Sequence, residues 1–147
     1  MTIASLGNVL RVFGGAVPDP EQRKDLVNEV LLMTLARATR SDTNIRAVEV
    51  TTVQKIIREA TGLEVSDVDI RVTAHSELFE TTPLDAALAK IRHQLIPEDR
   101  VLIATSLAKV IKSDLRVSPM ETPFFDQVAR ALDIPPAEVA GLLPGDL

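Results

Sequence analysis

Apolar residues recur at intervals of three and four positions along most of this 147-residue chain, which is the spacing of amphipathic helices. Helices are predicted over residues 3–13, 20–40, 46–60, 66–78, 83–95, 97–112, 119–132 and 136–142. The segment 68–72 (VDIRV) alternates as a strand would, but it is short and lies between helical patterns. The pattern therefore predicts an all-α fold, a compact bundle of about seven to eight helices.

Residues just before several of these segments match the signals of helix N-termini. Asp19-Pro20, Thr82-Pro83 and Ser118-Pro119 each place an oxygen-bearing side chain before a proline at the first helical position. Pro97 is followed by two acidic residues, which complement the partial positive charge of a helix N-terminus. These signals indicate four helix starts.

Two of the predicted helices are apolar on nearly every face, at 30–36 and 101–108, and such helices lie at the centre of a bundle. They also correspond to each other at a fixed offset of 72 residues. Across the nine positions of 34–42 and 106–114, four residues are identical and three are close replacements. We infer that the chain contains an internal repeat.

The repeat predicts how the chain is organised. We expect a single domain over 1–147, made of two related units at about 20–76 and 97–142. The units are expected to pack about a pseudo-two-fold axis, and residues 1–14 add an amphipathic N-terminal helix.

The repeat carries one pair of acidic residues twice. Asp42 is followed seven positions later by Glu49, and Asp114 by Glu121 in the same way. If the units pair about their central helices, the four carboxylates converge, and their repulsion requires either a cation or protonation. Oxygen ligands without thiolate favour hard cations, so Ca²⁺, Mg²⁺ or Mn²⁺ is the expected metal.

Helix capping is the alternative explanation of the same residues. Glu121 has the spacing of a capping box with the serine three positions before it. Asp42 and Asp114 suit turns, where an aspartate side chain accepts from the following backbone amides. Glu49 has no such explanation, because Arg46 at the expected N-cap position cannot accept a hydrogen bond from the helix. Both explanations stay open at this point.

Composition excludes several function classes. The formal net charge of −5 disfavours a nucleic-acid partner, because phosphate contacts need clustered Lys and Arg. The chain has no cysteine, which excludes disulfides and thiolate chemistry. The first residues lack the features of a secretory signal, and no apolar run is long enough to span a membrane. A cytoplasmic protein is therefore expected.

Recognisable catalytic arrangements are absent from the sequence. His75 and His93 are the only histidines, and they fall in separate predicted helices without metal-ligand spacing. Nucleophile-elbow, P-loop and dinucleotide-binding glycine patterns do not occur. We therefore expect no enzymatic activity, and no small-molecule substrate is evident.

The apolar residues of the first predicted helix are candidates for an interface. Ile3, Leu6, Leu10 and Phe13 form a stripe at helical spacing, and Phe124 precedes a second phenylalanine in the seventh predicted helix. Core packing is the simpler explanation of the stripe. The alternative is a contact between copies of the chain, as in a homodimer, or a weak attachment to a membrane surface. The expected partner is a protein or a second copy of the chain.

The duplicated pattern resembles the TerB-like family of tellurite-resistance proteins. The resemblance rests on a buried Leu-Ala helix, an Asp, a β-branched residue three positions later (Ile45, Val117) and a Glu seven positions later, over about 20–142. It implies an all-helical fold of about seven helices. It also implies an acidic cluster proposed to bind metal, which falls on the four residues named above. The family is associated with stress responses, often beside a membrane-associated partner, and has no established enzymatic activity.

Two positions depart from the family pattern. Thr43 and Leu115 stand where the family usually has a glycine after each motif aspartate, and neither residue adopts the left-handed conformation easily. Two functions are therefore carried forward. The first is a non-enzymatic TerB-like stress-response domain that binds a divalent cation and a protein partner. The alternative is a structural or oligomerisation domain whose metal site is degenerate.

Overall fold

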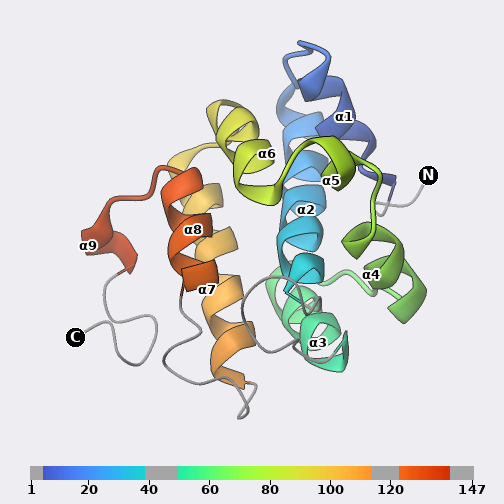
Figure 1. Ribbon diagram of the computed structural model, residues 1–147, viewed down its shortest axis with the longest axis vertical. Helices are drawn as coiled ribbons and strands as arrows, with labels where there is room; N and C mark the ends of the chain where they lie inside the picture. The colour runs from blue at the N-terminus through green and yellow to red at the C-terminus, as the bar shows by residue number, and fades with distance from the viewer. Residues whose placement is uncertain (1–4, 39–49, 114–122, 140–147) are drawn as a thin grey trace.

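The computed structural model describes residues 5–38, 50–113 and 123–139 (Figure 1). Its helices are α1 (Gly7–Phe13), α2 (Pro20–Arg37), α3 (Val50–Thr61), α4 (Asp67–Ala74), α5 (Leu78–Thr81), α6 (Leu84–Ile91), the 3₁₀ helix η3 (Arg92–Gln94), α7 (Pro97–Ser113), α8 (Pro123–Ala131) and α9 (Pro136–Val139). Within the described ranges every regular element is helical and none is a strand, which confirms the predicted all-α fold. None of these described helices is long and apolar enough to cross a membrane.

Helices α2 and α7 form the centre of the bundle. Residues 30–36 of α2 are fully buried, as are Ile103, Ala104 and Leu107 of α7, which confirms the central position predicted for both segments. α2 packs against α1, α3, α4 and α7, and α7 packs in addition against α3, α8 and α9. Figure 1 shows the two helices side by side and running in the same direction. Their N-terminal ends therefore lie at one end of the bundle and their C-terminal ends at the other.

A single hydrophobic cluster joins the layers around these helices. It includes buried residues from α1, α2, α3, α4, α6, α7 and α8, and most of them are aliphatic. Each fully buried Leu or Ile side chain stabilises the folded chain by roughly 1.5–3 kcal/mol relative to an exposed one. The organisation into two related units about a pseudo-two-fold axis stays a prediction.

The start of α2 confirms one of the predicted caps. The Asp19 carboxylate accepts a hydrogen bond from the Gln22 backbone N–H at 2.8 Å, and the Asp19 backbone N–H donates to the Gln22 side chain at 3.0 Å. This reciprocal capping box satisfies two donors, and Pro20 occupies the first helical position. Ser66 and Asp69 form the same arrangement at the start of α4.

Two details of the predicted elements were wrong. The segment 66–78 is not one helix, because α4 ends at Ala74 and the short helix α5 begins at Leu78 after a turn. Thr82 does not cap α6. Its backbone N–H donates to the Leu78 carbonyl at 3.0 Å and so closes α5, which leaves Pro83 before α6 without a capping side chain. The predicted start at Ser118-Pro119 lies outside the described residues.

The first helix is attached to α2 by a buried carboxylate. Leu6, which precedes α1, has a φ of 54° and provides no side-chain cap. Instead, Glu29 of α2 accepts hydrogen bonds from the backbone N–H groups of Asn8 at 2.8 Å and Val9 at 3.2 Å. The Asn8 side-chain amide donates to the same carboxylate at 2.6 Å. Glu29 is only 3% exposed. Although it lies 21 positions from Asn8 in the sequence, its carboxylate replaces the side chain of an N-cap residue.

Candidate functional site

The four carboxylates of the duplicated motif fall between described helices. Asp42, Glu49, Asp114 and Glu121 all lie outside the described residues. Their flanking helices are described: Glu49 directly precedes α3, and Asp114 directly follows α7. The structure therefore describes the helices on either side of this candidate metal site.

The helices that lead into both motifs end on the same side of the molecule. α2 and α7 pack against each other and run in the same direction, so their C-terminal ends lie at one end of the bundle (Figure 1). Each helix C-terminus carries a partial negative charge from its unsatisfied carbonyl groups, and this charge favours a nearby cation. The helices that precede Asp42 and Asp114 in the sequence therefore end at one side of the bundle.

Basic side chains also lie at these two helix ends. The Arg37 guanidinium donates to the Ala74 carbonyl at 2.8 Å and stacks 4.5 Å from the centre of the Phe79 ring, so it is held toward α4 and α5. Lys112 in the last turn of α7 is exposed. Within residues 5–38, 50–113 and 123–139, no three Asp, Glu or His side chains gather in a way that would hold a metal ion.

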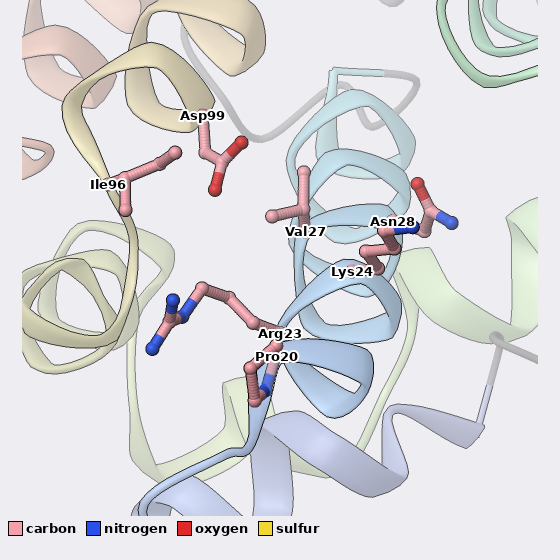
Figure 2. A pocket seen from close by; sticks show the side chains of 7 residues that line it. All are labelled: Pro20, Arg23, Lys24, Val27, Asn28, Ile96 and Asp99. Atoms are coloured by element: carbon pink, nitrogen blue, oxygen red, sulfur yellow. The ribbon is translucent and has the colours of Figure 1, made fainter.

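The opposite end of the α2–α7 pair carries a pocket that sequence reasoning missed. The pocket has a volume of about 400 Å³ and lies between the N-terminal half of α2 and the beginning of α7 (Figure 2). The side chains from α2 are Pro20, Arg23, Lys24, Val27 and Asn28, and the opposite wall consists of Ile96 and Asp99. The signal in the sequence was a stripe at helical spacing that mixes cationic and apolar residues.

The charged groups of this pocket influence one another. Burial raises the pKa of the Asp99 carboxyl, and the neighbouring charge of Glu98 adds to the rise. A backbone hydrogen bond from Ile96 and the positive charge of Arg23 act in the opposite direction and lower the pKa of Asp99, without cancelling the effect of burial. Asp99 therefore takes up a proton more readily than an exposed aspartate does.

The residues proposed for an interface differ in how far their side chains are exposed. Leu6 is 1% exposed and Phe124 is 5% exposed, so both pack in the core and present almost no surface to another molecule. Leu10 is 52% exposed on the outer side of α1. Phe13 is partly buried, with the Lys90 ammonium 5.1 Å from its ring centre, and Ile3 lies outside the described residues.

The two histidines lie in different elements of the described structure. His75 follows the last turn of α4, and His93 lies in η3. Both are exposed, and neither lines the pocket between α2 and α7.

Comparison with known proteins gives one match. The family model described as "Tellurite resistance protein TerB" matches residues 28–143, a span that contains the four motif carboxylates and most of the described helices. The match begins within α2, so α1 precedes it. No curated protein and no solved structure matches the chain.

Proposed function

Because the chain belongs to the TerB family of tellurite resistance proteins, we propose that it is a non-enzymatic stress-response domain that binds a divalent cation. The proposed ligands are the carboxylates of Asp42, Glu49, Asp114 and Glu121. The cation would neutralise a group of four like charges, and binding would link the two halves of the chain. A cytoplasmic setting and a protein partner, which could be membrane-associated or a second copy of the chain, are part of the proposal.

One observation supports this proposal most strongly: α2 and α7 are packed in parallel, so the two helices that precede the motif aspartates end at the same side of the bundle. An antiparallel pair would place the two aspartates at opposite ends of helices about 25 Å long. The negative ends of both helix dipoles would add to the attraction for a cation.

The chemistry of the donor set fits a hard cation. All four proposed ligands are carboxylates, and the chain has no cysteine to favour a softer metal. Ca²⁺ accepts six to eight oxygen ligands in flexible geometry, whereas Mg²⁺ requires a nearly octahedral site and retains several waters. Mn²⁺ also accepts carboxylate ligands. The proposal therefore covers these three ions.

The competing candidate is a structural or oligomerisation domain in which the motif residues act only as helix caps. Two observations favour it. Thr43 and Leu115 replace the glycines that allow the left-handed turn after each motif aspartate. Leu10 is a large apolar side chain that is more than half exposed, which suits a contact between copies of the chain.

Thermal unfolding of the EDTA-treated protein, titrated separately with Ca²⁺, Mg²⁺ and Mn²⁺, tests the two candidates. A cation that binds only the folded chain stabilises it by about 2.7 kcal/mol at a concentration one hundred times its Kd. We expect the midpoint to rise for the wild type and to stay constant for the Asp42→Asn, Asp114→Asn variant.

The matched control changes net charge equally at other positions. Asp25 and Glu59 are both exposed, and an Asp25→Asn, Glu59→Gln variant should respond to the cation as the wild type does. A midpoint that does not move in the wild type at millimolar concentrations of any of the three ions would contradict the metal proposal. Self-association that disappears when residues 1–14 are removed would favour the competing candidate.

A further inference from the structure

The pocket between α2 and α7 is built on one face of α2. The residues at 20, 23, 24, 27 and 28 follow the three- and four-residue spacing of a single helical stripe, and the residues that begin α7 close the opposite side (Figure 2). Its volume of about 400 Å³ lies within the range of roughly 300–1,000 Å³ that is usual for small-molecule sites. The pocket lies at the N-terminal ends of α2 and α7, away from the helix ends that lead into the acidic motifs.

The hydrogen-bond donors along the α2 wall have no partner within the described part of the chain. Arg23 and Lys24 form no side-chain hydrogen bond or ion pair there, and neither does the Asn28 amide. Arg23 is half-buried, and Figure 2 shows its guanidinium extending from α2 toward the α7 side of the pocket. A guanidinium offers five N–H donors in a planar arrangement that matches the two oxygens of a carboxylate or phosphate.

Apolar surface lies beside this guanidinium. Val27 is 7% exposed and forms the inner wall, whereas Ile96 is 45% exposed on the opposite side. An isoleucine left this exposed keeps apolar surface in contact with water, and a ligand that covers it gains the corresponding hydrophobic free energy. The pocket therefore combines a cation that has no ion-pair partner among the described residues with an exposed apolar surface.

Asp99 defines which side of the pocket suits a negative charge. In Figure 2 its carboxylate points into the space between the helices from the wall opposite Arg23. The positive charge of Arg23 acts on Asp99, but the two side chains do not form an ion pair, so the guanidinium stays available to a ligand. An anionic group is favoured beside Arg23 and Lys24 and disfavoured beside Asp99.

We propose that this pocket binds a small organic anion, with its carboxylate or phosphate on Arg23 and its apolar portion against Val27 and Ile96. Lys24 adds a second positive charge at the rim. The site differs from the proposed cation site in its position, in the sign of its charge and in the class of its ligand. It does not depend on the outcome of the metal experiment.

Chemical-shift titration of the ¹⁵N-labelled full chain tests this proposal. The probes are sodium hexanoate and hexyl phosphate, which separate the two anionic groups while keeping one apolar tail. Acetate keeps the charge without the tail, hexanol keeps the tail without the charge, and hexylammonium reverses the charge. We expect saturable shifts at the amides of 21–28 and 98–100 with at least one of the anionic probes. Acetate and hexanol should bind at least ten-fold more weakly, because acetate lacks the apolar tail and hexanol lacks the negative charge.

Two substitutions assign the binding to this pocket. Arg23→Gln should weaken hexanoate or hexyl phosphate binding about ten-fold or more. Ile96→Ala should reduce the advantage of hexanoate over acetate. Neither residue is buried, so both variants should retain the wild-type spectrum elsewhere. Lys55→Gln, which removes an exposed cation from α3, serves as the matched control and should bind as the wild type does.

Three results would overturn the proposal. One is the absence of saturable shifts in the pocket with both anionic probes. Another is equal binding of these probes to Arg23→Gln and to the wild type. The third is binding of hexylammonium at least as tight as that of hexanoate, which would mean that Asp99 dominates the site and that the ligand is a cation.

Discussion

Substitution of Glu29 by alanine should release helix α1 from the bundle. The Glu29 carboxylate accepts hydrogen bonds from the Asn8 backbone, the Asn8 side chain and the Val9 backbone, at distances of 2.6–3.2 Å. Because Leu6 provides no side-chain cap, no other described side chain satisfies the first N–H groups of this helix. Alanine leaves these donors without an acceptor, and the Val9 N–H belongs to a fully buried residue.

The expected loss follows from these three contacts. A hydrogen bond to a charged group contributes about 1.5–3 kcal/mol, and a buried donor left unsatisfied costs about 1–3 kcal/mol. The Asn8 side chain is only half-buried and can turn to water, which reduces the total. We expect Glu29→Ala to lower the free energy of unfolding by about 2–4 kcal/mol, a large share of the roughly 5–15 kcal/mol typical of a domain.

Urea unfolding followed by far-ultraviolet circular dichroism measures this loss. Glu29→Gln keeps the shape of the side chain but places an NH₂ group beside the N–H donors of Asn8 and Val9. This variant should lower the free energy of unfolding by about 1–2 kcal/mol. Glu59→Ala, an exposed glutamate in α3, is the control and should change stability by less than about 0.5 kcal/mol. If Glu29→Ala loses no more than Glu59→Ala, the carboxylate does not hold α1 in place.

Two further substitutions concern acidic residues at the starts of α2 and α7. Asp19→Ala removes the side-chain cap of α2 and should cost about 0.5–2 kcal/mol in urea unfolding, whereas an unchanged midpoint would show that the capping box contributes nothing. Burial raises the pKa of Asp99, so the folded chain holds this proton to higher pH than the unfolded chain does. The associated stability is present at low pH and is lost as the pH rises through the raised pKa. Relative to Asp99→Asn, the wild type should therefore lose stability as the pH rises through the carboxylate range, and parallel stability curves for the two proteins would contradict this.

Much of the fold was predictable from the sequence because helical periodicity and buried apolar stripes are local signals. The segments 30–36 and 101–108 are apolar on nearly every face, and both proved to lie in the central helices. The Asp19-Pro20 start was equally clear, since a cap depends only on residues within one turn.

The misjudged details depend on contacts between distant residues. Thr82 resembled an N-cap by its sequence alone, yet it closes α5 through the Leu78 carbonyl. Phe124 was expected at an interface and is buried beside Phe125, because α8 packs against both α6 and α7. The capping of α1 by Glu29 spans 21 positions and has no local signature.

The pocket between α2 and α7 could not be predicted from the sequence for the same reason. Arg23 and Asp99 are 76 positions apart, and only the parallel packing of α2 and α7 places them on facing walls. The acidic motif was visible because it repeats within the chain. Repetition could suggest that its carboxylates act together, but it could not say which ends of the central helices meet. The structure supplies that relation through the direction of the two helices.

The stoichiometry of cation binding, measured by isothermal titration calorimetry, tests the central claim most directly. The titration compares the wild type with Asp42→Asn, Glu49→Gln and with Asp114→Asn, Glu121→Gln, each of which removes the carboxylates of one unit. A site shared by the two units predicts one ion per chain in the wild type and loss of binding in either variant. Two ions per chain that fall to one in each variant, or no binding by the wild type, would contradict a shared site.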